Sequence, residues 1–363
     1  MNTERRLYIN GRFLTRRMTG VERVAYSICC AMRDMGQQFT IVCPKTTIQD
    51  CYDTEGMEIV FYGRGSSHFW EQMVLPFFFL GKKNYVLCCF TGLGSILVRS
   101  KIMTIHDLSF LENPKWFSRS YYLWYKIMTP LAARTSRYIL TVSQFSKNEI
   151  LRFYPYLDKD KVCVVYPAVD KGMFNVDSGF NDAGEPFALT VSSLDPRKNF
   201  IRLVEAFKGI TSCKLYIVGN ANRVFGSQGA LDDDNPNVKV LGRVSDEELV
   251  SLYRRAACFI FPSVYEGFGL PPLEAMACGC PVLASDIPVV REVCADAALY
   301  FNPIDIDDIR NAIEKFYAEM ERLRPMLQKR GADNVKRFDW AATAREVVRI
   351  ARSPENLLTI KSK

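Results

Sequence analysis

The sequence predicts an α/β protein of two doubly wound domains, each with a parallel sheet covered by helices. Two observations predict this class. The chain has 363 residues, more than one typical hydrophobic core accommodates. Short segments rich in Val, Ile, Leu and Phe alternate with helical stretches along the chain, as in parallel sheets. Hydrophobic residues make up 48% of the chain and charged residues 24%, which is ordinary for a globular protein and argues against disorder.

The strand-like segments fall into two series. The first is RLYIN, FTIVC, MEIVFY, YVLCCF, KIMTIHD, YILTVS and KVCVVY, and the second is PFALTVSS, KLYIVG, VKVLG, ACFIFPS, CPVLASD and AALYFN. Between them, residues 167–186 are polar and rich in Gly, Asn and Asp, which marks a linker. We expect one Rossmann-like domain over residues 1–170, a second over residues 171–340, and a C-terminal helix with a frayed tail over residues 341–363.

Capping residues predict where several helices begin. Ser245, with Glu248 three residues later, forms a capping box after the strand VKVLG. Ser143 or Ser146 can cap the helix that follows YILTV. Gly20 precedes a helix that contains VERVAYSI.

The net charge of +7 is concentrated in the first half of the chain. Residues 1–177 contain 23 Lys and Arg residues against 15 Asp and Glu residues. This balance favours an anionic partner, either a membrane surface or a phosphorylated substrate, and a solvated basic surface explains any single residue equally well. No apolar run reaches 18 residues and the N-terminus has no apolar signal region, so we expect neither a membrane span nor secretion.

The twelve cysteines lie in apolar runs, several of them as neighbours, and no C-x-x-C pair occurs. The chain has only two histidines. This pattern predicts reduced core thiols of a cytoplasmic protein rather than disulfides or a zinc site.

The segment FPSVYEGFGLPPLEAM is the densest candidate site. A strand leads into a loop with Gly267 and Gly269, and a helix is expected to begin near Pro271 or Pro272, where the missing N–H costs nothing. Glycines let a ligand approach the backbone closely, and a helix start offers its free amides to an anion. The loop is therefore placed where a parallel sheet binds anionic ligands.

Two carboxylates, Glu266 and Glu274, flank this loop. Acids beside an anion are useful if they accept hydrogen bonds from hydroxyls, and a vicinal diol of a sugar suits a carboxylate. We expect Glu274 in the first helical turn, where it would alternatively only complement the helix dipole.

The spacing E-x7-E in this segment strongly resembles the signature of the retaining glycosyltransferases of family 4, and the resemblance covers nearly the whole chain. It implies the GT-B fold: an N-terminal acceptor-side domain and a C-terminal nucleotide-sugar domain face a central cleft, and the C-terminal helix packs back on the first domain. By this resemblance, Glu266 contacts donor-sugar hydroxyls and Glu274 holds the ribose. The backbone amides around Phe268 to Leu270, including that of Gly269, are implied to contact sugar and diphosphate, and Gly267 is a further substrate-binding residue.

The segment TVSSLDPRKNF is a second match to the family. Arg197 and Lys198 lie together at an expected helix start, where two cations repel each other unless an anion joins them. Lys198 resembles the family's phosphate-binding lysine. Many members also have an arginine six residues earlier, which here is Ser192. Either Arg197 supplies the second charge, or the leaving group relies on Lys198 and backbone amides.

Further candidate residues follow from the resemblance. His106 and Asp107 end the strand KIMTIHD, and the family histidine lies against the donor sugar, although a lone histidine is more often structural. Gly20 resembles the N-terminal glycine loop, where many members have two adjacent glycines, and an ordinary loop explains it equally well. The backbone around Arg243 and Val244 is implied to contact the base.

The function that we expect is transfer of a hexose from a nucleotide-sugar donor to a glycan or lipid-linked hydroxyl in surface-polysaccharide synthesis. We do not expect nucleic acid as a partner. The resemblance to bacterial mannosyltransferases favours GDP-mannose, with rhamnosyl or UDP-sugar donors as alternatives. Another alternative is a non-catalytic nucleotide-sugar-binding protein. The pair Gly92 and Gly94 follows a strand, but it lacks the third glycine and the later acidic residue of a dinucleotide-binding fingerprint. A dehydrogenase or epimerase is therefore disfavoured.

No metal cofactor is expected, because no Asp-x-Asp cluster follows a strand and the tract 232–234 suggests a solvated loop. The aromatic and basic segments HFWEQMVLPFFFLG and PKWFSRSYYLWYKIMTPLAARTSR favour peripheral contact with an anionic membrane on the inner face of the plasma membrane. Packing of these aromatics against one another is the alternative for most of them.

Overall fold

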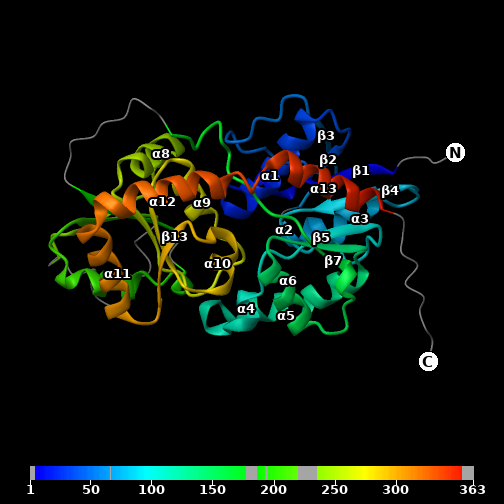
Figure 1. Ribbon diagram of the computed structural model, residues 1–363. Helices are drawn as coiled ribbons and strands as arrows, with labels where there is room; N and C mark the ends of the chain where they lie inside the picture. Colours follow the sequence, from blue (N-terminus) through cyan, green and yellow to red (C-terminus); the bar gives the residue numbers. More distant parts are fainter. Residues whose placement is uncertain (1–4, 66, 177–185, 193–194, 220–234, 354–363) are drawn as a thin grey trace. The chain divides into compact units, whose positions relative to one another are not determined.

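The computed structural model describes residues 5–65, 67–176, 186–192, 195–219 and 235–353 (Figure 1). The chain divides into two compact units. Unit 1 comprises Met1–Pro167 and Trp340–Lys363, and unit 2 comprises Ala168–Asp339. Each unit is built on one sheet in which all the paired strands run parallel.

The sheet of unit 1 has the strand order β3-β2-β1-β4-β5-β6-β7. Its strands are β1 Arg6–Asn10, β2 Thr40–Cys43, β3 Glu58–Phe61, β4 Tyr85–Cys89, β5 Lys101–Thr104, β6 Tyr138–Thr141 and β7 Val162–Val164. The chain runs outward from β1 to β3 and then resumes on the other side of β1 with β4. The loops after β1 and β4 therefore diverge at a topological switch point, where doubly wound sheets bind ligands.

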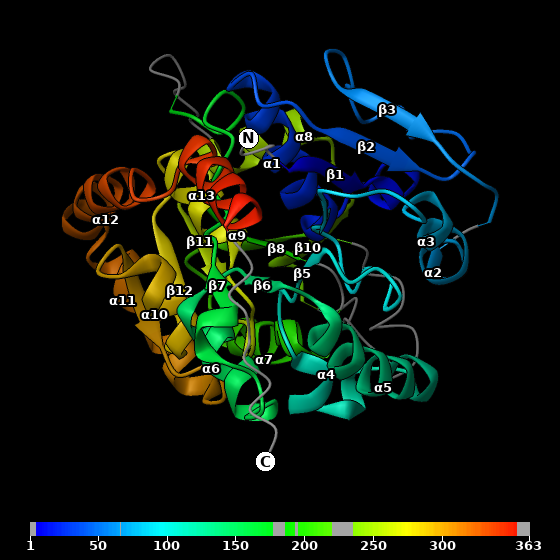
Figure 2. The same cartoon turned by 90° about the vertical axis from the view of Figure 1, so that its right-hand side faces the viewer.

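The helices of unit 1 cover both faces of this sheet. They are α1 Gly20–Asp34, α2 Ser67–Phe69, the π-helix η2 Trp70–Val74, α3 Leu75–Phe78, α4 Ser109–Glu112, α5 Arg119–Thr135, α6 Gln144–Phe153 and α13 Trp340–Arg352, with 3-10 turns η1 Gly11–Thr15, η3 Pro114–Trp116 and η4 Lys159–Lys161. The C-terminal helix α13 packs on α1, near the start of the chain (Figure 2). The Thr343 hydroxyl donates to the Tyr166 carbonyl at 2.7 Å, which joins α13 to the end of the first part of the unit.

The sheet of unit 2 has the strand order β10-β9-β8-β11-β12-β13. Its strands are β8 Phe187–Val191, β9 Lys214–Val218, β10 Val238–Gly242, β11 Cys258–Phe261, β12 Val282–Ser285 and β13 Ala298–Phe301. Its helices are α7 Phe200–Ala206, α8 Asp246–Arg255, α9 Leu270–Ala277, α10 Pro288–Cys294, α11 Ile306–Ala318 and α12 Met320–Val335, with 3-10 turns η5 Pro196–Lys198 and η6 Phe207–Gly209. The switch point of this sheet lies between β8 and β11.

The predicted strands and helix caps agree with the structure. Every residue of β5, β11 and β12 is buried, because helices cover both faces of a parallel sheet. The capping box of Ser245 and Glu248 opens α8. Of the two serines proposed for α6, Ser143 is the cap, and its hydroxyl accepts from the Ser146 amide at 2.9 Å.

All twelve cysteines are free thiols and nine of them are buried. The interpretation of every cysteine as a core residue is wrong for Cys51, which is exposed because it lies in the loop between β2 and β3. In the described part of the chain, no helix combines the length and the apolar character that a membrane span requires.

Candidate functional site

The loops after β8 and β11 meet at the switch point of unit 2 through one ion pair. The Lys198 Nζ lies 2.5 Å from the Glu266 Oε1, and these side chains are only 13% and 8% exposed. Sequence reasoning selected both residues for a ligand but did not anticipate that they pair. A lysine ammonium has three N–H donors, so Lys198 can hold Glu266 and still donate to an anion.

Asn199 fixes the turn that carries Lys198. Its backbone is left-handed, with φ 61° and ψ 28°, a conformation that asparagine tolerates better than most residues. The buried side-chain amide donates to the carbonyls of Pro262 at 3.1 Å and Pro303 at 2.6 Å. Sequence reasoning missed this role, and an asparagine directly after the turn DPRK was the available signal.

Arg197 is held by its own turn. Its Nε donates to the Asp195 Oδ2 at 2.8 Å, and Asp195 also caps the 3-10 turn by accepting from the Arg197 amide. The Arg197 carbonyl accepts from the Val264 amide at 2.8 Å, which is a second link to the loop after β11. Arg197 therefore lies beside Lys198 with its guanidinium directed to a carboxylate.

Next to this turn, the backbone at the carboxyl ends of β8 and β9 is closely packed. The Ser192 amide donates to the Val218 carbonyl at 3.1 Å. A Cβ on Gly219, whose φ is 145°, would lie 1.9 Å from the Ser192 carbonyl oxygen. Only glycine fits there, so the loops after β8 and β9 pack backbone to backbone. Gly219 was not anticipated from the sequence.

The helix α9 begins one residue earlier than expected. Its N-cap is Gly269, with a left-handed φ of 104°, and Leu270 is its first residue. Prolines occupy the next two positions and have no N–H, so Gly269 and Leu270 provide the amide donors of this helix start. These are two of the amides proposed for sugar and diphosphate.

The expected position of Glu274 in the first helical turn is wrong. Because α9 begins at Leu270, Glu274 is its fifth residue and lies in the second turn. The helix dipole acts mainly within the first turn, so it does not explain this acid. The Glu274 Oε2 accepts from the Tyr253 hydroxyl of α8 at 3.2 Å. Burial, together with the charge of Glu274, raises the pKa of Tyr253 well above its usual value, so this phenol stays a donor.

The residues expected near the base lie between β10 and the capping box of α8. Arg243 is exposed and Val244 is half-buried. Gly242 precedes them with φ 73°, and its carbonyl accepts from the Gly219 amide at 2.8 Å. These residues thus occupy the same edge of the sheet as Ser192 and Lys198.

In unit 1, His106 follows β5 and its ring is held by the residue that directly follows the neighbouring strand β4. The Nε2 lies 2.7 Å from the carbonyl oxygen of Phe90, which only accepts, so Nε2 carries the proton and Nδ1 is the acceptor. Burial lowers the pKa of His106, although the Phe90 carbonyl and the charge of Asp107 act in the opposite direction. The imidazole is therefore neutral near pH 7.

Asp107 and Gly20 occupy loop and helix-start positions in the same unit. The Asp107 Oδ1 accepts from the Ser109 amide at 2.9 Å and hydroxyl at 2.6 Å, so it organises the start of α4. Gly20 is the first residue of α1. A Cβ at Gly20 would meet no atom within 4 Å, so packing within the unit does not require glycine there.

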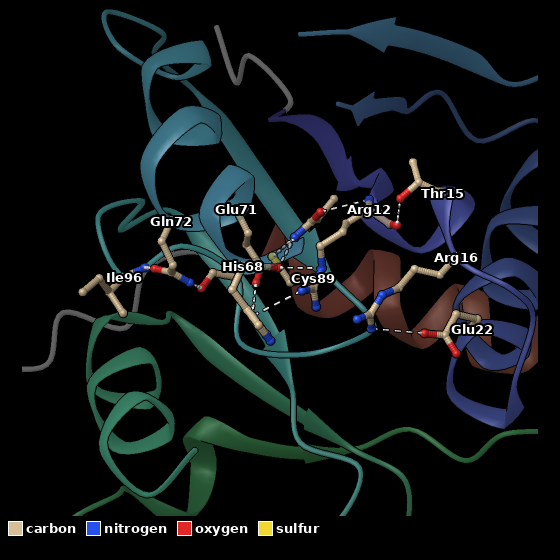
Figure 3. Close-up of polar contacts among 11 residues, drawn as sticks. Arg12, Thr15, Arg16, Glu22, His68, Glu71, Gln72, Cys89 and Ile96 are labelled. Carbon is tan, nitrogen blue, oxygen red and sulfur yellow. Dashed lines mark hydrogen bonds and ion pairs between the residues drawn. The ribbon is translucent and has the colours of Figure 1, made fainter. Parts of the chain in front are cut away.

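A buried polar cluster at the switch point of unit 1 was missed (Figure 3). Arg12, after β1, and Glu71, in the π-helix, are 2% and 1% exposed and lie 3.7 Å apart. Asn10 donates to Glu71 at 2.6 Å, and Arg12 donates to the His68 Nδ1 at 3.2 Å. Burial alone would raise the pKa of Glu71, but Arg12, His68 and Asn10 together hold it below its usual value.

Two consecutive polar residues of the π-helix are buried. The three successive residues Trp70, Glu71 and Gln72 are all buried in this π-helix, which is more than one narrow helix face provides. Gln72 binds the loop after β4 by donating to the Gly94 carbonyl at 2.8 Å and accepting from the Ile96 amide at 3.0 Å (Figure 3). The π-helix therefore holds both loops of the switch point, and an acid inside the apolar run HFWEQMVL was the sequence signal.

No group of three or more His, Cys, Asp or Glu residues suited to a metal ion occurs among the described residues. The tract 232–234, expected to be solvated, lies outside them. The groups that the described residues bring to this part of unit 2 include one lysine, one arginine, two helix-start amides and the carboxylates of Asp195, Glu266 and Glu274.

Two family models match the chain. Residues 18–172 match the family described as Glycosyltransferase Family 4, and residues 175–333 match Glycosyl transferases group 1. O-antigen chain mannosyltransferase RfbU of Salmonella typhimurium is 32% identical over 271 residues, covering 72% of this chain and 75% of that protein. O-antigen chain mannosyltransferase B of Escherichia coli is 30% identical over 260 residues, covering 66% of each.

Solved structures with low sequence identity share the fold. HepE of Anabaena, solved in complex with UDP, has a TM-score of 0.72 at 17% identity, covering 95% of this chain and 98% of that chain. Sucrose-phosphate synthase from Thermosynechococcus elongatus has a TM-score of 0.74 at 18% identity, covering 95% and 98%.

Proposed function

The chain belongs to glycosyltransferase family 4, whose members are retaining, and on this premise we propose that it transfers mannose from GDP-mannose to a hydroxyl of a glycan or lipid-linked acceptor in surface-polysaccharide synthesis. The family assignment and the fold of two parallel-sheet Rossmann-like domains, as in GT-B enzymes, confirm the expectations from the sequence. Mannose as the sugar is supported by the two O-antigen mannosyltransferases that resemble the chain.

The observation that carries the proposal is the Lys198–Glu266 pair at the switch point of unit 2. Departure of a diphosphate builds negative charge, and a shielded cation nearby stabilises that charge more than an exposed one does. Lys198 has N–H groups left for a phosphate oxygen. Glu266 is then placed to accept from hydroxyls of the sugar that is joined to that phosphate.

We propose the remaining roles in donor binding for residues of the same unit. The amides of Gly269 and Leu270 donate to the diphosphate at the start of α9, and Arg197 adds positive charge beside Lys198. Glu274 accepts from the ribose hydroxyls while Tyr253 holds one of its oxygens. Gly267, Phe268, Ser192, Arg243 and Val244 line the donor site mainly through backbone groups.

His106, Asp107 and Gly20 are the proposed contributions of unit 1. A neutral His106 with Nε2 bonded to Phe90 presents Nδ1 as an acceptor for a sugar hydroxyl. Asp107 organises the adjacent loop, and the open space at Gly20 permits a phosphate or acceptor to approach the start of α1.

The proposed reaction needs no dedicated nucleophile. The bond from the anomeric carbon to the phosphate oxygen breaks, a bond to the acceptor oxygen forms on the same face of the sugar, and the acceptor proton goes to the departing phosphate. The cations and helix-start amides stabilise that phosphate, so we propose that a chelator leaves the rate unchanged.

Nucleotide binding tests the proposed donor. In calorimetric titrations with GDP, UDP and dTDP, GDP is expected to bind with the lowest dissociation constant. UDP is the second candidate for the donor nucleotide, because HepE was solved with UDP. A response to UDP alone would replace mannose transfer from GDP-mannose by a UDP-sugar reaction, and binding of a nucleotide without turnover of any donor would favour a non-catalytic protein.

A further inference from the structure

The helix α5 in unit 1 exposes several of its large apolar residues along one side. The residues that it buries are Thr129, Ala132 and Ala133. On the opposite side, Leu123, Ile127 and Leu131 recur every four residues and are exposed, with Trp124 beside them. Helices of globular proteins normally direct their large apolar residues toward the core, as Tyr122, Tyr125 and Met128 of this helix do. This exposed ridge therefore marks a face that meets another apolar surface.

A second exposed ridge runs along the helical segment from α2 to α3. Its members, spaced as one helix face, are Phe69, Met73, Phe77 and Leu80. The same segment buries Trp70 and Phe79 in the core, so its aromatic residues divide into a packed set and an exposed set. Packing against the sheet explains only the first set.

The two ridges belong to one face of the unit. The core under α2–α3 contains Leu87 and Cys89, and the core under α5 contains Met103. Cys89 pairs with Met103 in the parallel register, so these side chains lie on the same side of the sheet. The His68 ring lies 5.3 Å from the Trp124 ring, which joins the start of α2 to α5 directly. Both segments are on the same side of unit 1 in Figure 2.

The charges around this face are almost all positive. Between Glu112 and Glu149 the chain has no acidic residue and six basic ones, and Lys82 and Lys83 follow the α2–α3 ridge. The acid within that ridge segment, Glu71, is buried and paired with Arg12. Along these two segments of the chain, the exposed apolar residues are thus accompanied mainly by cations.

A basic groove adjoins the α2–α3 ridge. It has a volume of about 700 Å³ and lies at the amino ends of β1 to β3, with Phe78 and Lys82 in its wall. Its other charged lining residues are Arg5, Arg6, Arg352 and Glu58. The Lys82 ammonium lies 4.6 Å from the Phe78 ring centre, so it is held at the boundary between groove and ridge.

We propose that this face of unit 1, formed by α2–α3 and α5, docks on an anionic lipid bilayer, with the ridges in the interfacial region and an acidic headgroup at the Lys82 groove. An anionic bilayer surface binds apolar side chains in its interfacial region and attracts the cations that flank them. A second copy of the chain suits the face less well, because a symmetric contact would bring the cations of both copies together. The proposal goes beyond sugar transfer and does not depend on it.

Vesicle co-sedimentation of the full chain tests the proposal without any sugar donor. The probes are vesicles of phosphatidylcholine alone and vesicles with about one third phosphatidylglycerol. The protein is expected to sediment with the anionic vesicles, and less so in high salt because salt screens the cations. Ile127→Glu is expected to lower the partition coefficient about tenfold or more, since it places a charge in the apolar contact.

The matched control is Ile201→Glu in unit 2, because Ile127 and Ile201 are both 59% exposed helix residues. It is expected to bind vesicles as the unchanged chain does. Lys82→Ala is expected to weaken binding to anionic vesicles roughly fivefold and to leave the phosphatidylcholine result unchanged. Unchanged thermal unfolding of each variant would exclude loss of the fold as the cause.

Several results would overturn the proposal. One is failure of the unchanged chain to bind anionic vesicles, and another is equal binding by the Ile127→Glu and Ile201→Glu variants. A dimer that forms without lipid and that Ile127→Glu dissociates would assign the face to a second copy instead. Lys198→Ala is expected to bind vesicles normally, so failure of vesicle binding and failure of sugar transfer are separate outcomes.

Discussion

Lys198 and Glu266 each satisfy the other's charge. The pair therefore holds a shielded cation and a shielded carboxylate in fixed positions. Electrostatic stabilisation works best when the groups are already oriented, because little reorganisation is then needed during the reaction. The pair is thus both a structural link between two loops and the centre of the proposed donor site.

Replacing Lys198 with Ala is expected to reduce the transfer rate about 10²- to 10³-fold, as loss of one preorganised donor typically does. It also leaves the buried Glu266 carboxylate without its cation, which should lower the free energy of unfolding by roughly 1–3 kcal/mol. Steady-state kinetics and urea unfolding measure the two effects. The double variant K198A/E266A is expected to recover stability but not transfer, and recovery of transfer would contradict the assigned role.

Two variants of Asn199 separate the contribution of its backbone conformation to stability from that of its side-chain hydrogen bonds. Asn199→Gly keeps the left-handed turn and removes the bonds to Pro262 and Pro303, while Asn199→Ala also strains the backbone. We expect both variants to be less stable, and Asn199→Ala to be less stable than Asn199→Gly by roughly 1 kcal/mol. Urea unfolding checks the order. Equal stability of the two variants would show that the turn does not demand this conformation.

His106 predicts a pH dependence of stability. Burial holds the pKa of His106 below the ordinary 6.5, so just below pH 6.5 the imidazole is protonated in the unfolded chain but neutral in the folded chain. The contribution of His106 to stability is complete above pH 6.5 and is lost as the pH falls below that value. His106→Asn should unfold with a shallower slope of stability against pH below 6.5 than the unchanged chain. An identical slope in both proteins would remove His106 as its source.

At the scale of elements, two helix starts carry the proposed contacts with the donor and acceptor. The start of α9 combines a left-handed glycine with two prolines that remove competing N–H groups. The start of α1 has a glycine with open space around it. The two glycines differ in their role. The left-handed backbone angle at Gly269 requires glycine, whereas the backbone at Gly20 does not.

The glycines Gly20 and Gly219 make a matched pair of tests. Gly20→Ala is expected to leave thermal unfolding unchanged, because its Cβ meets nothing, and to lower kcat/KM if a ligand approaches α1 there. Gly219→Ala is expected to lower the melting temperature strongly, because its Cβ would overlap the Ser192 carbonyl. Full activity of Gly20→Ala would contradict the proposed approach of a ligand at this helix start.

Elements were predicted more reliably from the sequence than the contacts among them. The buried strands of both sheets are apolar runs bounded by polar loops, and the serine caps are local signals, so both could be read directly. The start of α9 was misplaced because leucine carries no signal for a first helical position. Glu274 was consequently assigned to the wrong turn.

At the scale of the whole molecule, the chain forms two units, and the second is completed before the chain returns to the first through α13. The sequence pattern was sufficient for the two parallel sheets. The Lys198–Glu266 pair, the Asn199 bonds and the Arg12–Glu71 pair join residues at least 59 positions apart in the chain, so no local pattern specifies these partners. The isolated acid in HFWEQMVL and the asparagine after DPRK were local signals for Glu71 and Asn199, but neither signal identified the partner residues.

The central claim is that the chain transfers mannose with retention of the anomeric configuration and that Lys198 stabilises the leaving diphosphate. The most direct measurement is turnover of GDP-mannose on a lipid-linked acceptor extract, with NMR of the product linkage, for the unchanged chain and Lys198→Ala in the presence of a chelator. We predict an α-linked product, the same configuration as the donor, from the unchanged chain and at least a 10²-fold lower rate from the variant. An inverted β-linkage, undiminished turnover by Lys198→Ala, or no transfer from GDP-mannose would contradict the account.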